Sequence, residues 1–330
     1  MLVSIILPVY NGARYLSDAI ESVLAQTHQT IEVLIADDGS FDGSWELIQK
    51  YAQKDSRIKA WRNEVRLGLF ANYNRTIKKA TGEFIKLFAQ DDLMAPEAIA
   101  ELTHALHDNA SAVIAACGRS VIEDPFSEKA KEDLACQDKP ISLPAGLNKG
   151  HDVILKCLSE YRNLIGEPVT VMFRSKHRQM QFNENYLSLG DLELWFRFLA
   201  EGDLVYLPAP LVSFRDHKES QTQTLLRDLD WVLDFLRLSR EYEGQLQELG
   251  IARQDYCMRF VELASPLVEA NIRTDKEFVD SLPLHKELAY YLMRRLPSAL
   301  AGQANYQSVL SSTSWRVTRP LRLIKEKLER

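Results

Sequence analysis

The first third of the chain alternates between short apolar runs and longer segments with helical spacing of apolar residues. Continuous apolar runs that suit buried strands occupy residues 3–9, 31–36, 58–61 and 84–89. Helical spacing appears between them at Leu16, Ala19, Ile20, Val23 and Leu24, and again over 45–52, 72–80 and 96–106. This alternation predicts right-handed crossovers and a Rossmann-like α/β fold, with a mainly parallel sheet flanked by helices.

The pattern is less regular in the middle of the chain. Strands are predicted at 112–116, 169–173 and 204–207, with a helix over 192–200 that stops before Gly202. Polar, turn-rich residues 123–150 predict a long loop. From residue 220 onward the pattern is helical, so we divide the chain into a domain over 1–218 and a helical C-terminal extension over 219–330.

Composition narrows the class of protein without naming a function. The chain has 330 residues, of which 46% are hydrophobic, and its formal net charge is −6, which argues against a basic surface for nucleic acid. The four cysteines are far apart with no CxxC spacing, so we expect reduced thiols and no zinc site. The apolar start is too short for a signal peptide, and no run of membrane-spanning length follows. We therefore expect a cytoplasmic protein, either free or peripheral on a membrane surface.

Two acidic pairs follow two of the predicted strands. Asp37 and Asp38 end the run at 31–36, and Asp91 and Asp92 follow the run at 84–89. Carboxyl ends of parallel strands meet at one edge of a sheet, and adjacent carboxylates favour a divalent cation such as Mg²⁺ or Mn²⁺. The alternatives are an N-cap of the next helix for Asp91-Asp92 and an Asx turn into Gly39 for Asp37-Asp38. Because no glycine-rich phosphate loop is present, a metal would neutralise any bound diphosphate.

Two later stretches offer further candidates. Asp191, in "GDLELW", stands at a predicted helix start, where it is either the N-cap or a general base. Glu193, two positions on, either reaches the site or forms an ion pair. His217, in "SFRDHKES", is either a metal ligand or an ordinary surface or core histidine.

Together these stretches resemble family 2 glycosyltransferases with the GT-A fold. The resemblance rests on "VSIILPVYNGARYLSDAIESVLAQT", "IEVLIADDGSFDGS", "TGEFIKLFAQDD", "GDLELWFRFLAEG" and "FRDH" in this order, and it covers residues 1–218. It implies a nucleotide-sugar-binding half over 1–118 and an acceptor and catalytic half over 119–218.

The resemblance also implies roles for single residues. Asp191 matches the catalytic base, Asp92 and His217 match metal ligands, and Asp91 faces ribose or metal. The nucleotide-sugar pocket is expected to include Pro8, Val9, Tyr10, Asn11, Asp38, Arg66 and Asn74. Candidate acceptor contacts are Glu167, Glu193 and Trp195. The chain departs from the family pattern at Ala89, Gly190 and Tyr73, where relatives often have Asp, Glu and Arg.

The activity implied is inverting transfer of a sugar from a nucleotide-diphosphate sugar, with Mn²⁺ or Mg²⁺ as cofactor. The expected donor is a UDP-sugar, and the expected acceptor is a glycan or lipid-linked glycan in bacterial surface polysaccharide or lipopolysaccharide synthesis. Alternatives are a nucleotidyltransferase that makes nucleotide sugars, a receiver-like signalling domain and a nucleotide-binding scaffold without turnover.

The C-terminal stretch "STSWRVTRPLR" resembles a short motif of bacterial surface-polysaccharide glycosyltransferases. Residues 315–330 carry six basic and two acidic residues interleaved with apolar ones. This composition suits a basic amphipathic helix at an anionic membrane surface. The alternative is a helix packed on its own domain or on a second copy of the chain, so homo-oligomerisation is a further expectation.

Overall fold

The computed structural model describes residues 1–123, 143–217, 230–257, 259–260 and 263. It consists of two compact units, Met1–Lys218 and Glu219–Arg330. The predictions for residues 124–142, within the expected loop, for the motif at 312–322 and for the basic helix at 315–330 lie outside the described residues. The assignment of donor and acceptor roles to the two halves of the first unit stays a prediction.

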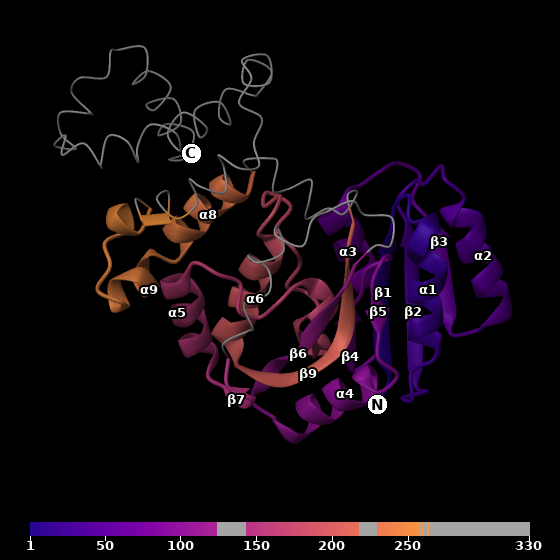
Figure 1. Cartoon of the computed structure of the whole chain (residues 1–330), viewed down its shortest axis with the longest axis horizontal. Coiled ribbons are helices and arrows are strands. Elements are labelled where there is room, and N and C mark those ends of the chain that lie inside the picture. The colour runs from indigo at the N-terminus through magenta and orange to yellow at the C-terminus, as the bar shows by residue number, and fades with distance from the viewer. Residues whose placement is uncertain (124–142, 218–229, 258, 261–262, 264–330) are drawn as a thin grey trace, which may run out of the picture. The chain divides into compact units, whose positions relative to one another are not determined.

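Four parallel strands form one end of the first unit. They are β1 (Val3–Val9), β2 (Ile31–Asp37), β3 (Ile58–Arg62) and β4 (Phe84–Leu87), joined through α1 (Ala13–Leu24), α2 (Ser44–Lys54) and α3 (Leu69–Ile77). β1 and β2 are buried at every residue, as expected for parallel strands covered on both faces. The four strands run side by side in the order β3-β2-β1-β4 (Figure 1).

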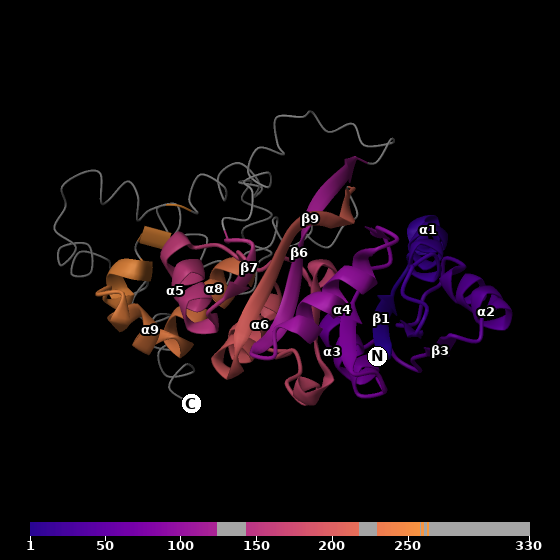
Figure 2. The ribbon, with the colours of Figure 1, turned by 90° about the horizontal axis from the view of Figure 1, so that it is seen from below.

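The order of these strands reverses direction between β1 and β4. The chain moves outward from β1 to β2 to β3 and then returns to the other side of β1. Right-handed crossovers therefore put α1 and α2 on one face of the sheet and α3 on the other, as Figure 2 shows. In open α/β sheets, ligands bind outside the carboxyl ends of the strands at such a switch point. The loops after β1 and β4 flank it here.

The sheet continues from β4 with strands of mixed direction. The remaining elements are β5 (Leu93–Met94), α4 (Ala98–Asp108), β6 (Ala112–Glu123), β7 (Gly146–Asn148), α5 (Gly150–Glu160), the 3-10 helix η2 (Pro168–Thr170), β8 (Val171–Arg174), α6 (Gly190–Glu201) and β9 (Asp203–Asp216). The full order is β3-β2-β1-β4-β8-β6-β9-β5, with β7 beside β9. β8 is antiparallel to both β4 and β6, whereas β6 and β9 are parallel. The predicted α/β fold class is confirmed, and the parallel arrangement is concentrated in the N-terminal strands.

β6 and β9 are far longer than the predicted strands at 112–116 and 204–207. Their pairing shifts register around Gly118, where a Cβ atom would clash with the carbonyl oxygen of Pro208. Beyond this irregularity the two strands contain polar residues and prolines. The spacing of apolar residues therefore does not predict the rest of either strand. The extra length of β9 carries Arg215 to the carboxyl edge of the sheet.

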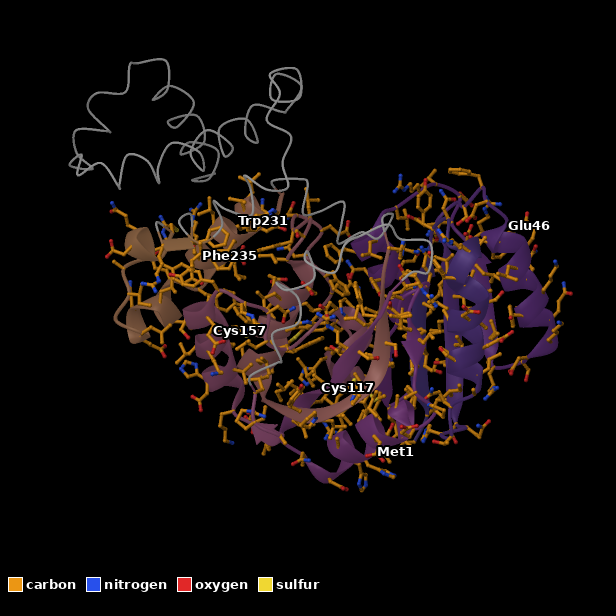
Figure 3. All side chains as sticks on the ribbon, viewed as in Figure 1. Met1, Glu46, Cys117, Cys157, Trp231 and Phe235 are labelled. Atoms are coloured by element: carbon orange, nitrogen blue, oxygen red, sulfur yellow. The ribbon has the colours of Figure 1, made fainter. Side chains whose placement is uncertain are left out.

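Three of the four cysteines lie in the described residues. Cys117 in β6 and Cys157 in α5 are free and lie well apart in Figure 3, and Cys257 is free as well. Cys136 lies outside the described residues.

The second unit contains α8 (Asp230–Glu241) and α9 (Glu243–Glu248), and residues 253–257 and 259–260 are helical as well. Phe235, labelled in Figure 3, stacks on Phe260 with ring centroids 3.9 Å apart, and Tyr256 stacks on Phe235 at 5.7 Å. These contacts give the unit an aromatic core of its own. Among the residues that the structure describes, no helix is both long and apolar enough to cross a membrane.

Candidate active site

One glutamine side chain ties together the loops after β1 and β4. Gln90 Oε1 accepts a hydrogen bond from the Tyr10 backbone N–H at 2.8 Å, and Gln90 Nε2 donates to the Tyr10 carbonyl at 3.1 Å. A Cβ atom at Gly12 would clash with the same side chain. The Gln90 amide therefore holds the loop after β4 to the loop after β1 at the switch point. Sequence reasoning noted that Ala89 lacks the usual carboxylate but missed this role of Gln90, because it depends on pairing across 80 positions.

The predicted nucleotide residues fall into two groups. Pro8 and Val9 are buried within β1, where they pair with Ala36 and Asp37. They therefore support the carboxyl edge of the sheet from inside, and their side chains are not on its surface. Tyr10 is partly exposed, and the Arg66 guanidinium carbon lies 3.9 Å from its ring centroid. These two side chains meet at the sheet edge although the sequence separates them widely.

Asn11 follows Tyr10 in the left-handed region, with φ of 48°. Its backbone N–H donates to Ser40 Oγ at 2.9 Å, and its Oδ1 accepts from the Phe41 N–H at 3.1 Å. Asn11 therefore joins the loop after β1 to the loop after β2. This connection adds the β2 loop to the edge that Gln90 organises.

Asp38 is buried and organises the loop ahead of α3. Its carboxylate accepts hydrogen bonds from Asn63 Nδ2 at 2.9 Å and from the backbone N–H groups of Leu67 and Gly68, both at 2.8 Å. These bonds hold the segment that carries Arg66 beside Tyr10. The contact predicted between Asp38 and a nucleotide base stays a prediction.

The neighbouring Asp37 forms the expected turn. Its Oδ2 accepts from the Ser40 N–H at 3.2 Å and contacts Arg62 Nε at 3.1 Å. The turn interpretation thus fits Asp37, whereas Asp38 reaches into the following loop. The two adjacent carboxylates therefore stabilise different loops.

Asn74 uses its whole amide within the chain. Nδ2 donates to the Phe182 carbonyl at 2.9 Å and to Glu184 Oε1 at 3.1 Å, while Oδ1 accepts from the Phe182 N–H at 2.7 Å. Asn74 therefore anchors the segment ahead of α6. Its predicted nucleotide contact stays a prediction.

The end of β9 lies against the acidic loop after β4. His217 Nε2 is 2.9 Å from Asp91 Oδ2. Arg215 donates from Nε to the Asp91 carbonyl at 2.9 Å and from its backbone N–H to Asp92 Oδ1 at 2.8 Å. The chain continues from Asp92 into β5, and α4 begins only at Ala98, so the N-cap interpretation of Asp91-Asp92 is wrong. β9 brings His217 to these carboxylates, as the metal hypothesis requires.

Asp92 lacks sufficient positive charge around it. Burial raises its pKa well above the ordinary value, and the negative charge of Asp91 raises it further. The bond from the Arg215 N–H and the charge of Lys86 oppose this shift. A divalent cation would supply the missing charge, because carboxylate oxygens and an imidazole nitrogen are ligands that Mn²⁺ accepts.

The donors at this loop fit a cation that also binds a ligand. No group of three or more His, Cys, Asp or Glu side chains is arranged to hold a metal ion within the described residues. Mg²⁺ in phosphate-transfer sites is held by one or two carboxylates, with the remaining oxygens coming from water and substrate phosphates. Asp91 and His217, in contact at 2.9 Å, offer a carboxylate oxygen and an imidazole nitrogen that would suit such an incomplete site, with Asp92 next to them in the chain.

Asp191 lies in the first turn of α6, one residue after Gly190. The N-cap position belongs to Leu189, so the N-cap interpretation of Asp191 is wrong. Its Oδ1 accepts from the Leu192 N–H at 2.7 Å, and its Oδ2 accepts from Asn163 Nδ2 at 3.2 Å. Burial nevertheless raises its pKa to about 7, with the charge of Glu167 adding to the shift against these hydrogen bonds. Desolvation outweighs the helix N–H groups, which leaves a carboxylate suited to proton transfer near neutral pH.

The charges of the acidic loop and of Asp191 all raise the pKa of one buried phenol. Tyr73 in α3 donates its hydroxyl to the Phe88 carbonyl at 2.9 Å. Burial raises its pKa, and the charges of Asp92, Asp91 and Asp191 each raise it further. Three carboxylates from two distant parts of the chain therefore act on the same hydroxyl group. The position where relatives often carry Arg holds a neutral phenol here.

Glu167 is the link between the two acidic regions. Its charge acts on both Asp92 and Asp191, and its Oε2 lies 3.0 Å from Arg119 Nε. Arg119 follows the irregularity at Gly118 in β6, and its guanidinium lies 5.3 Å from the ring centroid of Phe214. Sequence reasoning missed Arg119, because one polar residue after an apolar strand carries no signal of its own.

The other two candidate acceptor contacts have structural roles. Glu193 is buried and pairs with Arg197, with Glu193 Oε1 2.6 Å from Arg197 Nε. The ion-pair interpretation of Glu193 is the one observed. Trp195 has no exposed surface, and its indole N–H donates to the Gly166 carbonyl at 3.0 Å. Both residues lie on the buried face of α6. We therefore do not retain them as acceptor contacts.

Known sequences resemble this chain over much of its length. The sequence profile described as Glycosyl transferase family 2 matches residues 4–164. An uncharacterised glycosyltransferase of Rickettsia typhi is 30% identical over 235 residues, which cover 69% of this chain and 68% of that protein. The Bacillus subtilis protein EpsE, also named as a glycosyltransferase, is 30% identical over 201 residues, which cover 61% of this chain and 67% of EpsE.

Solved structures share the fold at low sequence identity. The 1–349 fragment of S. aureus TarS in complex with UDP-GlcNAc matches with a TM-score of 0.59 at 16% identity, over 89% of this chain and 79% of the fragment. Mannosyltransferase PcManGT from Pyrobaculum calidifontis, in complex with GDP-Man and Mn²⁺, matches with a TM-score of 0.54 at 14% identity, over 97% of this chain and 86% of that one. The fold, the acidic edge and the sequence relatives together establish that this chain is an enzyme of glycosyltransferase family 2 with the GT-A fold.

Proposed function

We propose that this enzyme catalyses inverting, metal-dependent transfer of a sugar from a nucleoside-diphosphate sugar to a hydroxyl group of a glycan or lipid-linked glycan. The proposal is carried by the contact of His217 Nε2 with Asp91 Oδ2 at 2.9 Å, together with the charges of Asp191, Asp91 and Asp92, which all raise the pKa of the buried Tyr73 hydroxyl. A base and a cation-binding loop at one edge are the two parts that such a transfer needs. The solved relatives with UDP-GlcNAc and with GDP-Man and Mn²⁺ support this class of donor.

The donor nucleoside binds at the edge formed by the loops after β1 and β2. Tyr10 and Arg66 offer a flat aromatic and cationic surface there, and Asn11 fixes the neighbouring loop. Asp38 holds the Arg66 segment and is the proposed acceptor for a base N–H. A UDP-sugar is the proposed donor, with the base chosen by this edge.

Asp92, His217 and Asp91 are the residues that would hold the cation beside the donor diphosphate. A divalent ion bound there supplies positive charge that stabilises the departing diphosphate. Arg215 adds a guanidinium at the same loop, fixed by the Asp91 carbonyl at 2.9 Å and lying 4.6 Å from the Tyr15 ring centroid.

Asp191 is the proposed general base. Its carboxylate takes the proton of the acceptor hydroxyl while that oxygen forms a bond to the anomeric carbon. The bond from the anomeric carbon to the diphosphate oxygen breaks with its electron pair leaving on the diphosphate, which inverts the configuration. The pKa of Asp191, raised to about 7, makes it a stronger base than an exposed aspartate.

The acceptor site is proposed to lie along Glu167 and Arg119. Their ion pair borders both acidic regions, and its oxygen and nitrogen groups suit the hydroxyls of a sugar. Surface polysaccharide or lipopolysaccharide synthesis remains the proposed setting, on the strength of the sequence resemblance.

A thermal-shift panel tests the donor class. The full chain is heated with UDP, GDP, dTDP or CDP, each with and without Mn²⁺. Stabilisation by one nucleotide that requires Mn²⁺ supports the proposal, because a ligand that binds the folded state raises its stability. Absence of stabilisation by any nucleotide, with or without metal, would overturn it.

A further inference from the structure

Lys86 is a fully buried lysine in the middle of the sheet. It lies in β4 between β1 and β8, opposite Met172, and its side chain has no exposed surface. Its ammonium group donates to the carbonyl oxygens of Leu87 at 2.8 Å and of Val171 at 3.4 Å. It also donates to the carbonyl oxygen of Val169. Within the described part of the chain, Lys86 forms no ion pair with a carboxylate.

The burial of this charge has no evident benefit for stability. Burial of an unpaired ammonium is costly, and an apolar side chain of similar length would avoid that cost. Burial lowers the pKa of Lys86 to about 8, while the negative charge of Asp92 acts in the opposite direction. The group therefore remains mainly an ammonium at neutral pH, with all three N–H bonds available for the carbonyl oxygens.

The carbonyl groups that Lys86 binds belong to a segment that supports Asp191. Val169 lies within η2, which begins directly after Glu167, and Val171 begins β8. At the other end of this segment, Asn163 Nδ2 donates to the Gly166 carbonyl at 3.1 Å and to Asp191 Oδ2 at 3.2 Å. The segment 163–171 thus connects Lys86 to the proposed base.

The other end of the connection is the acidic loop. β4 runs from Lys86 directly into the residues that include Asp91 and Asp92. The ammonium of Lys86 therefore joins the strand that carries the cation-binding loop to the segment that orients the base. Beyond the short β4 pairing with β8, this is a direct side-chain connection between the two parts of the site.

We infer that Lys86 is a positioning residue for glycosyl transfer, holding segment 163–171 against β4 so that Asp191 and the Asp91-Asp92 loop keep one relative geometry. This inference rests on the proposed function. Lys86 touches neither sugar nor diphosphate in this role. It acts through the carbonyl groups of η2 and β8, and the donor nucleoside edge at Tyr10 and Arg66 is independent of it.

The test compares Lys86→Met with Lys59→Met in the full chain. Met keeps most of the stem of Lys and removes its charge and donors. Lys59, in β3, is a matched control. Its Nζ lies 2.8 Å from Glu32 Oε2, and it has no bond to segment 163–171. Three quantities are measured for each variant, namely hydrogen exchange of peptides spanning 163–171, the affinity for UDP or GDP with Mn²⁺, and the rate of nucleoside-diphosphate release from the donor sugar.

We expect Lys86→Met to speed hydrogen exchange in segment 163–171 while β1–β3 exchange as before. The rate of release at saturating donor should fall roughly 10- to 100-fold, because small misplacements of reacting groups have effects of this size. The affinity for the nucleotide with Mn²⁺ should change by less than about threefold, since the nucleoside edge is untouched. Lys59→Met should match the unmodified chain in all three measurements.

A second variant separates positioning from a general loss of stability. Thr170 is buried, and its hydroxyl donates to the Glu167 carbonyl at 2.8 Å, so Thr170→Val loosens η2 from inside while Lys86 stays in place. If Lys86 acts through η2, the double variant should be no more than about twofold slower than the slower single variant. Independent, multiplying effects on the rate would overturn the inference.

Unchanged hydrogen exchange in Lys86→Met would also overturn it, and this measurement needs no donor. A chain that releases no nucleotide from any donor sugar would count against the proposed function instead. In that case the exchange data alone still decide whether Lys86 holds segment 163–171. The two failures are therefore distinguishable.

Discussion

Asp91 Oδ2 lies 2.9 Å from His217 Nε2, although 126 positions of the chain separate the two residues. The same end of β9 binds the neighbouring carboxylate, because the Arg215 N–H donates to Asp92 Oδ1 at 2.8 Å. β9 therefore forms one wall of the acidic loop. If a divalent ion binds here, Asp91 and His217 are two of the residues that would hold it.

Substitution of His217→Ala should weaken Mn²⁺ binding without unfolding the chain. We expect the apparent affinity for Mn²⁺, measured in the presence of the preferred nucleoside diphosphate, to fall roughly 10- to 100-fold. The side chain lost is a direct ligand in the proposed site, and Asp91 loses its partner as well. His28→Ala is the matched control, since His28 contacts the Met1 carbonyl away from the acidic loop. Equal Mn²⁺ affinities of His217→Ala and the unmodified chain would remove His217 from the site.

Removal of the base should abolish turnover and spare donor binding. Asp191→Asn keeps the shape of the side chain but cannot accept the acceptor proton, so the turnover rate should fall on the order of 10²- to 10⁴-fold. The dissociation constant of the nucleoside diphosphate, measured by calorimetry, should stay the same. Asp152→Asn, in the first turn of α5 and exposed, is the control and should retain full activity. Near-normal turnover of Asp191→Asn would show that another group is the base.

The pH dependence of turnover should report the same carboxylate. Because the pKa of Asp191 is raised to about 7, the turnover rate at saturating donor should rise with pH and level off above about 7. The profile is measured with donor and Mn²⁺ held saturating at each pH. A limb near the ordinary pKa of an exposed aspartate would contradict the raised value.

The contribution of Asp191 to the stability of the folded chain should fall as pH rises, whereas turnover rises. The raised pKa means that the folded chain keeps this proton where the unfolded chain has lost it, so the contribution to stability is present at low pH and is lost as pH rises through about 7. Asp191→Asn should therefore gain stability relative to the unmodified chain as pH increases from 4 to 8. Chemical unfolding at several pH values measures this difference. A constant difference across this range would show that Asp191 is not perturbed.

Gln90 should matter for donor binding as well as for stability. Gln90→Ala removes two hydrogen bonds to the Tyr10 backbone, which should lower the free energy of unfolding by about 1–3 kcal/mol. The nucleotide edge should loosen too, since Tyr10 faces Arg66 there. Gln53→Ala, at an exposed position of α2, serves as the control in both the unfolding and the binding measurements. Loss of stability with unaltered nucleotide affinity would leave Gln90 a purely structural role.

The fold and the neighbourhood of the site follow largely from local patterns. The spacing of apolar residues predicts β1, α1 and β2 almost to the residue, because a buried parallel strand and an amphipathic helix each impose their own period. Parallel topology then places strand ends at one edge, which explains why Asp91-Asp92 could be recognised as candidates before any coordinates were known. Asp191 and His217 were candidates from their own stretches, and the family resemblance then implied that they act at the same site as these carboxylates.

The division of work among these residues was decided by tertiary structure. Asp38 binds the loop before α3, Trp195 is buried and bonds the Gly166 carbonyl, and Gln90 binds the Tyr10 backbone at the switch point. Lys86 reads as one polar residue in an apolar strand, and only its contacts with Val169 and Val171 connect it to the site. The physical reason is common to all four. A hydrogen bond or a change in pKa depends on which groups from distant parts of the chain share a buried space, and local periodicity carries no information about that.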